Sequence, residues 1–358
     1  MSRLHRTLFA PIVAVLFSCT PPEGGEEVAV PEPPVAQVEP TDLTAQGVTR
    51  IDDYFWLRER EDPEVITYLE AENDYTAAVM AHTEELQAAL FEEIRGRIKE
   101  DDSSVPYKDG DYFYYTRYEE GMEYPIHARK AGSLDAPEEV MLDANAMAEG
   151  HDYFAIGGRQ VTQDGRILAY GVDLQGRRFY TVRFKDLTTG ETLSDQIPDV
   201  TGNMAWANDN RTLFYVKQDP ETLRSYQVFR HVLGTDPATD ELVFQEDDTE
   251  FSVYMGRFKS DEYLFVASTQ TLSTEVRVLD ADEPTGEFSV VLPREPEHEY
   301  SVDHFGDHFY IRTDDQAKNF RLVRAPVGDA SRANWEEVIP HRDNVLLEGF
   351  DVFREHLV

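Results

Sequence analysis

Short apolar segments follow tight turns at regular intervals along most of this chain. Asp109-Gly110 precedes YFYY, Asp164-Gly165 precedes ILAY and Asp209-Asn210 precedes TLFY. Asp-Gly and Asp-Asn accept the positive φ angles of hairpin turns, and aromatic and branched residues favour strands. The pattern therefore predicts repeated β-hairpins. The equivalent positions of six copies, of which the last three are weaker, are Gly110, Gly165, Asn210, Asp261, Gly306 and Arg354.

These positions lie 45 to 55 residues apart, which is the length of one four-stranded propeller blade. A single blade cannot bury its apolar face, so neighbouring blades must stack around an axis. The sequence predicts an all-β fold over residues 105–358, an incomplete β-propeller of about five blades and the start of a sixth. A further turn of the kind found in propellers is expected at Asp186 to Gly190, after the strand RRFYTVRFK.

Residues 41–104 show a helical pattern instead. Asp62-Pro63-Glu64 has the features of a helix start, with a capping side chain, proline at the first position and an acid in the first turn. A second helix is predicted from about Thr83, because Leu86, Leu90, Ile94 and Ile98 recur every four residues. Each helix needs an apolar partner surface, either the propeller or a domain outside this chain.

The N-terminus has the features of a secretory signal over residues 1–18. Arg3 and Arg6 precede an apolar stretch of ten residues, which is too short to span a membrane. The segment Leu16-Phe17-Ser18-Cys19 resembles a bacterial lipobox, and Cys19 is the single cysteine of the chain. We therefore expect lipidation of Cys19 and a bacterial cell-envelope location, on the outer membrane and facing the periplasm. The alternative is an ordinary cleaved signal.

Residues 19–40 form the next segment. Between Thr20 and Pro40 there are six prolines, five glutamates and no aromatic residue, which predicts an extended tether. The whole chain has 33 Lys and Arg against 70 Asp and Glu, a net charge of −37. This charge argues against nucleic acid as a partner. It serves either solubility or the attraction of cationic ligands such as basic peptides.

The sequence lacks the motifs of common catalytic and cofactor sites. No G-x-S-x-G, GxGxxG, P-loop or HExxH string occurs, so no catalytic residue and no cofactor is assigned. His298, His304 and His308 are close in sequence, but the last two flank the Gly306-Asp307 turn, where side chains have no fixed common direction, and we expect no metal site there. Asp143-Ala144-Asn145 begins like a calcium loop, but Met147 stands where an oxygen ligand is needed.

Four longer strings carry a family resemblance: DDYFWLREREDPEVITYLEAENDYT, RIKEDDSSVPY, YYTRYEEGMEYPIHAR and ANDNRTLFYV. From about Pro40 to Val358 the chain resembles oligopeptidase B, of the prolyl oligopeptidase family of serine peptidases. The resemblance implies a seven-bladed propeller that restricts access to an α/β-hydrolase domain. That domain is absent from this chain, and by resemblance it would follow Val358 and pack against the helices.

The resemblance further implies hydrolysis of short peptides after Lys or Arg. The family's catalytic Ser, Asp and His belong to the hydrolase domain, so none is carried onto a position here and we expect the chain alone to be inactive. The expected partners are short basic peptides, the hydrolase domain and a membrane reached through the lipid anchor. The alternative hypothesis is a catalytically dead, lipid-anchored propeller that acts as a binding scaffold.

Overall fold

The structure is a computed structural model that describes residues 31–358. The chain divides into two compact units, the first ending at Lys99 and the second running from Glu100 to Val358. Residues 31–40 contain no helix or strand. Cys19, the signal segment and the first part of the expected tether lie outside the described residues.

The first unit contains a hairpin and two helices. Strands β1 (Thr41–Ala45) and β2 (Val48–Asp52) pair around a Gln46-Gly47 turn in which both residues have positive φ. The sequence pattern did not reveal this hairpin. The remaining elements are η1 (Phe55–Arg58), α1 (Pro63–Met80), η2 (Ala81–Thr83) and α2 (Glu84–Arg95).

Helix α1 begins where the sequence predicts. The Asp62 carboxylate accepts a hydrogen bond of 2.8 Å from the backbone N–H of Glu64, and Pro63 is the first helical residue. Both features satisfy the unpaired donors at a helix start. Helix α2 also begins as expected, after Thr83, but it ends at Arg95, so Ile98 lies beyond it. No helix of residues 31–358 is long and apolar enough to cross a membrane.

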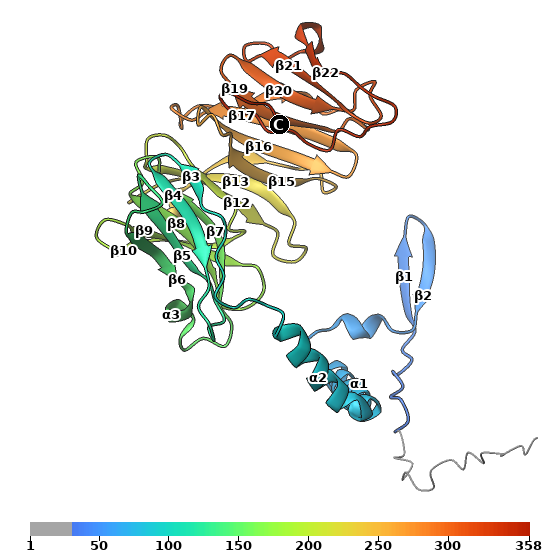
Figure 1. The fold of residues 1–358 in the computed structure, drawn as a ribbon. Helices are drawn as coiled ribbons and strands as arrows, with labels where there is room; N and C mark the ends of the chain where they lie inside the picture. The colour runs from blue at the N-terminus through green and yellow to red at the C-terminus, as the bar shows by residue number, and fades with distance from the viewer. Residues whose placement is uncertain (1–30) are drawn as a thin grey trace, which may run out of the picture. The chain divides into compact units, whose positions relative to one another are not determined.

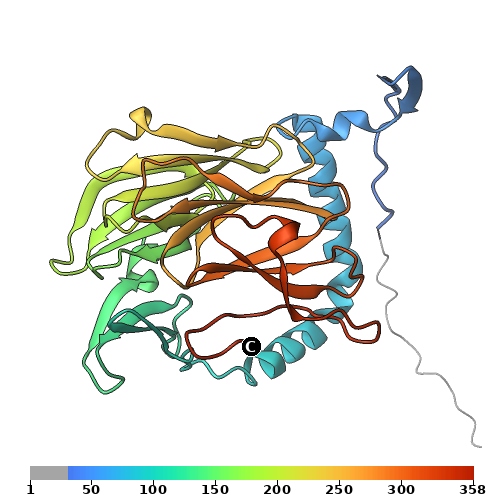
Figure 2. The same ribbon diagram turned by 90° about the horizontal axis from the view of Figure 1, so that it is seen from above.

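The second unit consists of five four-stranded antiparallel sheets, each built from four consecutive strands. The sheets follow one another in chain order, from green to red in Figures 1 and 2. This arrangement confirms the predicted incomplete propeller. The strands are β3 (Tyr107–Asp109), β4 (Tyr112–Arg117), β5 (Ile126–Ala131) and β6 (Glu138–Asp143); β7 (Ala155–Val161), β8 (Ile167–Asp173), β9 (Tyr180–Asp186) and β10 (Thr192–Val200); β11 (Met204–Trp206), β12 (Thr212–Gln218), β13 (Ser225–Val232) and β14 (Glu241–Gln245); β15 (Ser252–Arg257), β16 (Tyr263–Gln270), β17 (Ser273–Asp280) and β18 (Ser289–Leu292); and β19 (Tyr300–Phe305), β20 (His308–Thr313), β21 (Arg321–Pro326) and β22 (Glu336–Ile339).

Short helices connect some of these strands. They are α3 (Ala144–Ala148), η3 (Pro237–Thr239) and η4 (Arg332–Asn334). Near the end of the described chain, Val352 and Leu357 form an antiparallel bridge around Arg354-Glu355. The sixth predicted turn is thus a turn, although residues 340–358 hold no four-stranded sheet.

The repeated turns have the backbone conformation that their residue types require. All five turn positions before the strands of the sheets have positive φ, between 54° and 72°. Glycine enters this left-handed region without steric cost, and Asn and Asp enter it more readily than other residues. The turn at Asp186 also forms as predicted, because its carboxylate accepts hydrogen bonds from the N–H groups of Thr188 and Thr189. The five turn positions with positive φ are Gly110, Gly165, Asn210, Asp261 and Gly306.

Four apolar clusters hold the five sheets together, one between each successive pair. Strand β8 illustrates the arrangement, since every one of its seven residues is buried. Leu168 and Tyr170 face the first sheet, whereas Ile167 and Ala169 face the third. A strand buried on both faces has a continuous apolar sequence, as ILAY does. Each sheet therefore depends on its neighbours for burial of its apolar residues.

The first strands of the second, third and fourth sheets contact one another, β11 lying next to both β7 and β15. The Trp206 indole N–H donates to the Gln160 carbonyl at 3.0 Å, which joins β11 to β7. Backbone also approaches closely at Gly158, where an added Cβ would lie 1.9 Å from the carbonyl oxygen of Gly202. Only glycine fits at that position. We call β3, β7, β11, β15 and β19 the inner strands.

Candidate functional site

Charged and aromatic side chains gather on the inner strands. Tyr107 on β3 and Tyr254 on β15 are 63% and 48% exposed. Burial nevertheless raises the pKa of both phenols, so each is surrounded by protein while still in contact with water. This combination is typical of a wide concave surface. We call the following set the inner-strand surface: Tyr107, Asp109, Arg159, Tyr254 and Arg257.

Opposite charges meet on the inner-strand surface. The pKa of Asp109 is raised by burial and by the charge of Asp261, while Arg257 acts in the opposite direction. The Arg257 guanidinium is also 2.9 Å from the Asp261 carboxylate. Asp109 belongs to β3 of the first sheet, and Asp261 lies in the turn between β15 and β16 of the fourth, yet the charge of Asp261 acts on the Asp109 carboxyl. The first and fourth sheets therefore approach each other at this surface, as expected for sheets that are stacked around a common axis.

A buried histidine supports Arg159 from the neighbouring sheet. The Arg159 Nη1 group lies 2.9 Å from Nε2 of His127, and the hydroxyl of Thr116 lies 3.0 Å from Nδ1. Because arginine only donates, Nε2 must accept, and the proton of the neutral ring is on Nδ1. Burial and the charge of Arg159 lower the pKa of His127 to about 4. His127 is therefore neutral at pH 7 and fixes the position of the guanidinium.

Among the described residues one serine–histidine pair is hydrogen-bonded, but its geometry does not suit nucleophilic catalysis. The Ser260 hydroxyl is 2.8 Å from Nδ1 of His304, whose ring is 1% exposed. In residues 31–358, Nε2 of His304 has no hydrogen-bond partner, so no third group orients the ring. Tyr263 and Phe309 pack edge-on against the ring. The pair fastens the turn of the fourth sheet to the fifth.

The residues weighed for metal binding are used in other ways. His298 bonds through Nε2 to the Thr313 hydroxyl at 2.8 Å, and His304 bonds to Ser260. The Asp143 carboxylate caps α3 by accepting from the backbone N–H groups of the next turn. Across residues 31–358 no group of three or more His, Cys, Asp or Glu side chains is arranged to hold a metal ion.

Helix α2 carries an apolar face that is open to solvent. Leu86, Leu90, Phe91 and Ile94 are between 46% and 61% exposed, and α2 buries none of its twelve residues. A helix with such a stripe normally buries it against another element. In α1, by contrast, Val65 is buried. The exposed face of α2 is therefore a second candidate functional feature, as a docking surface.

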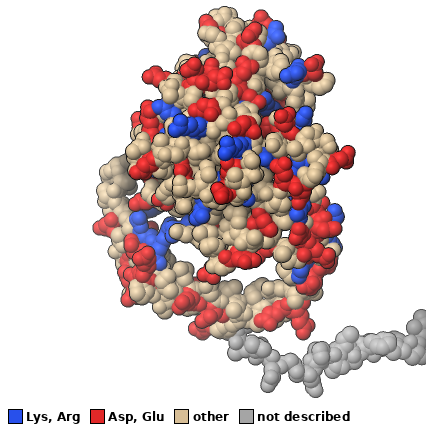
Figure 3. All heavy atoms as spheres, turned by 90° about the vertical axis from the view of Figure 1, so that its left-hand side faces the viewer, with Lys and Arg blue, Asp and Glu red and all other residues tan. Residues whose placement is uncertain are grey.

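Acidic side chains cover much of the molecular surface. In Figure 3 Asp and Glu outnumber Lys and Arg on the face shown, as the net charge of −37 implies. Against this background the cations of the inner-strand surface are unusual, because burial lowers the pKa of Arg159 and of Arg257. Sequence analysis missed both arginines. In the sequence, the feature that could have indicated them was a charged residue within a predicted strand such as Ala155–Val161.

The family comparison assigns nearly all of the described chain. Residues 33–358 match the model of "Prolyl oligopeptidase, N-terminal beta-propeller domain". Among curated proteins, dipeptidyl aminopeptidase BI of Pseudoxanthomonas mexicana is 42% identical over 96% of this chain and 50% of its own length. Protease 2 of Moraxella lacunata is 36% identical over 88% of this chain and 48% of its own length.

Solved structures agree with this assignment. Oligopeptidase B from Leishmania major superposes with a TM-score of 0.82 at 31% identity, over 90% of this chain and 48% of that one. Oligopeptidase B from Trypanosoma brucei gives a TM-score of 0.81 at 27% identity over the same share of this chain. The chain thus spans about half the length of the curated relatives it matches.

Proposed function

The chain belongs to the prolyl oligopeptidase family, as its N-terminal β-propeller domain, and we propose that it limits access of substrates to a serine peptidase that hydrolyses short peptides after Lys or Arg. The observation that carries this proposal is the inner-strand surface. It combines aromatic rings with charges of both signs, and at this surface the charge of Asp261 from the fourth sheet acts on Asp109 of the first. Such a surface can contact a peptide in transit without reacting with it.

Catalysis is assigned to a hydrolase domain expected C-terminal to Val358. Two observations support this division of labour. The relatives are about twice as long as this chain, and the Ser260–His304 pair has a buried histidine ring and lacks a third group within residues 31–358. The exposed apolar face of α2 is the proposed docking surface for that domain. Its Leu90 and Ile94 would leave water on docking, at roughly 25 cal/mol for each Å² of apolar surface buried.

We further propose that Cys19 carries a lipid anchor that holds the protein in the bacterial cell envelope, on the outer membrane facing the periplasm. The support is the lipobox-like segment Leu16–Cys19 and the Pro/Glu-rich stretch that follows it. Metabolic labelling with a radioactive fatty acid, compared between the protein and Cys19→Ser, tests the anchor. Equal labelling of both proteins would contradict the proposal that Cys19 carries the lipid anchor.

The function is tested by two preparations, residues 19–358 alone and the same chain extended by the segment encoded after Val358. We expect no cleavage of an arginyl amide by the shorter chain. The longer one should prefer this substrate to the citrullyl amide by at least about tenfold, because citrulline lacks the charge of arginine. Cleavage by the shorter chain would contradict the division of labour.

A second specificity is favoured by one comparison. The relative that is 42% identical is named a dipeptidyl aminopeptidase. If the longer protein released dipeptides from free N-termini irrespective of Lys or Arg, that activity would replace the proposed specificity. A blocked and an unblocked version of the same arginyl peptide distinguish the two.

A further inference from the structure

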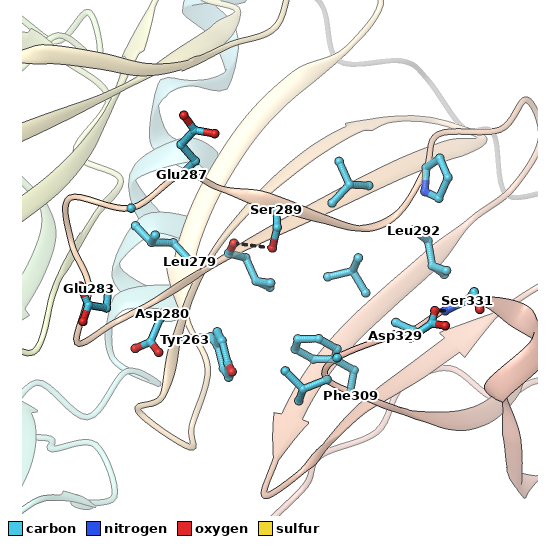
Figure 4. A pocket seen from close by; sticks show the side chains of 18 residues that line it. Tyr263, Leu279, Asp280, Glu283, Glu287, Ser289, Leu292, Phe309, Asp329 and Ser331 are labelled. Atoms are coloured by element: carbon cyan, nitrogen blue, oxygen red, sulfur yellow. Dashed lines mark hydrogen bonds between the residues drawn. The ribbon is translucent and has the colours of Figure 1, made fainter.

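A pocket of about 630 Å³ lies between the fourth and fifth sheets. One wall is β18 together with the hairpin that precedes it, and the other is the loop Val327–Ser331 after β21. Figure 4 shows the side chains of Tyr263 and Phe309 between these two walls. We call this pocket the inter-sheet groove.

The floor of the inter-sheet groove is apolar. Leu292 and Phe309 are each 2% exposed and belong to the cluster that joins the two sheets. Tyr263 and Val327 pack against the same cluster. A floor of this kind favours aliphatic side chains of a ligand, since burying them removes apolar surface from water.

The rim of the groove carries negative charge only. Four carboxylates line it and no Lys, Arg or His does. In Figure 4 Asp280 and Glu283 lie at one end of the view and Asp329 at the other. Hydrogen bonds from Ser331 hold the pKa of Asp329 below its ordinary value, so this carboxyl stays ionised. The fourth carboxylate belongs to Glu287.

Two of these carboxylates are not engaged elsewhere. Among residues 31–358, the side chains of Glu283 and Glu287 form no hydrogen bond or ion pair, whereas Asp280 and Asp329 accept from nearby backbone N–H groups. A cation placed between Glu283 and Glu287 would meet no competing positive charge in the pocket. The groove is thus complementary to a positively charged ligand.

Strand β18 adds backbone hydrogen-bonding groups to the groove. It is the last strand of its sheet, and no described strand pairs with its outer edge. Residues Ser289–Leu292 of this strand also line the pocket. An extended peptide can add to such an edge, with its backbone bonded to the strand and alternate side chains directed into adjoining pockets.

We propose that the inter-sheet groove binds an extended peptide in which Lys or Arg alternates with aliphatic residues. The backbone would lie along β18, the aliphatic side chains on the apolar floor and the cations against Glu283 and Glu287. This proposal is independent of the peptidase activity, because it concerns binding between the fourth and fifth sheets and is measured without cleavage.

A second pocket offers an internal comparison. It has about 650 Å³, lies between the second and third sheets and is lined by both Arg183 and Lys217. The two pockets are similar in size, but only this second one is lined by cationic side chains. A basic peptide should therefore not bind to it. A ligand that bound to any large pocket would bind to both pockets equally.

The test is fluorescence anisotropy of a labelled octapeptide that alternates arginine with valine, added to residues 19–358. A matched octapeptide has glutamate in place of arginine. Gly328→Phe fills the groove, since a Cβ at Gly328 meets nothing within 4 Å, and Gly349→Phe is the matched control with equal free space outside the groove. Glu283→Gln/Glu287→Gln removes two rim charges. Glu191→Gln/Glu221→Gln removes two exposed charges elsewhere.

We expect the arginine peptide to bind and the glutamate peptide not to bind. Gly328→Phe should abolish binding, and the rim double variant should weaken it about fivefold, as expected for two partly exposed charge pairs. Both control variants should bind as the unmodified chain does. No binding of the arginine peptide would overturn the proposal. Equal weakening by the two charge variants would also overturn it, because only the overall charge would then matter.

Discussion

Buried histidines act as fixed connectors in this molecule. His127, His231 and His304 are each 3% exposed or less. His231 lies between two carboxylates, with Nδ1 at 2.8 Å from Asp240 and Nε2 at 3.4 Å from Asp195. His127 supports Arg159 of the next sheet. Buried polar groups need such partners, because a missing hydrogen bond costs about 1–3 kcal/mol.

At this scale we predict that His127 makes the protein less stable as the pH falls. Its pKa is about 4 in the folded chain and about 6.5 in an unfolded one, so between these values only the unfolded state binds the proton. Stability linked to the neutral ring is complete above pH 6.5 and is lost on acidification. From pH 7 to pH 5 the loss is about 2 kcal/mol.

Urea unfolding of the protein and of His127→Gln at pH 7 and pH 5 measures this effect. The difference in unfolding free energy between the unmodified protein and His127→Gln should be smaller by about 2 kcal/mol at pH 5 than at pH 7. His151→Gln, at an exposed histidine, is the control and should follow the unmodified protein. If His127→Gln lost as much stability between pH 7 and pH 5 as the unmodified protein, the pH dependence would come from groups other than His127.

At the scale of elements, the inner strands are joined by side chains that replace sheet hydrogen bonds. The Asn203 side chain accepts from the N–H of Met255 at 2.8 Å and donates to its carbonyl at 2.9 Å. The amide thus satisfies both backbone groups of a residue on β15 that is 3% exposed. It ties the third sheet to the fourth where the inner strands themselves are not paired.

We expect Asn203→Ala to lower the free energy of unfolding by about 2–4 kcal/mol, because both groups of Met255 would lose their partner in the interior. The measurement is chemical denaturation followed by tryptophan fluorescence. Asn334→Ala removes a single exposed hydrogen bond and should cost less than about 1 kcal/mol. Similar costs for both variants would mean that water replaces the Asn203 amide.

At the scale of the whole molecule, the two units differ in how completely they bury their apolar residues. Each sheet of the second unit is covered by a neighbour through the four clusters. Helix α2 of the first unit has an apolar face in contact with water. Exposed patches of this kind commonly mark interaction surfaces.

We predict that Leu90→Gln/Ile94→Gln decreases self-association of the chain and its binding of the dye ANS. The free energy of unfolding should change by less than about 0.5 kcal/mol, because neither side chain is buried. Leu134→Gln/Leu272→Gln makes the same chemical change at two similarly exposed leucines outside α2. Sedimentation velocity compares the three proteins, and equal association of both variants would show that α2 has no special role.

Features that depend on local conformation could be predicted from the order of residues alone. Turn positions such as Gly165 and Asn210 were predictable, because a positive φ is a demand on one residue. The start of α1 at Pro63 was predictable for a similar reason, since the capping of a helix involves adjacent residues. The repeat of these local signals also gave the number of sheets.

The contacts between residues that are distant in the chain became visible only in the folded molecule. The charge of Asp261 acts on Asp109 of a distant sheet, His127 supports Arg159, and the groove brings β18 next to Val327–Ser331. For residues so far apart in the chain, no spacing pattern in the sequence predicts that they will be in contact. Their proximity follows from the curvature of the stacked sheets, which depends on packing in all four clusters together.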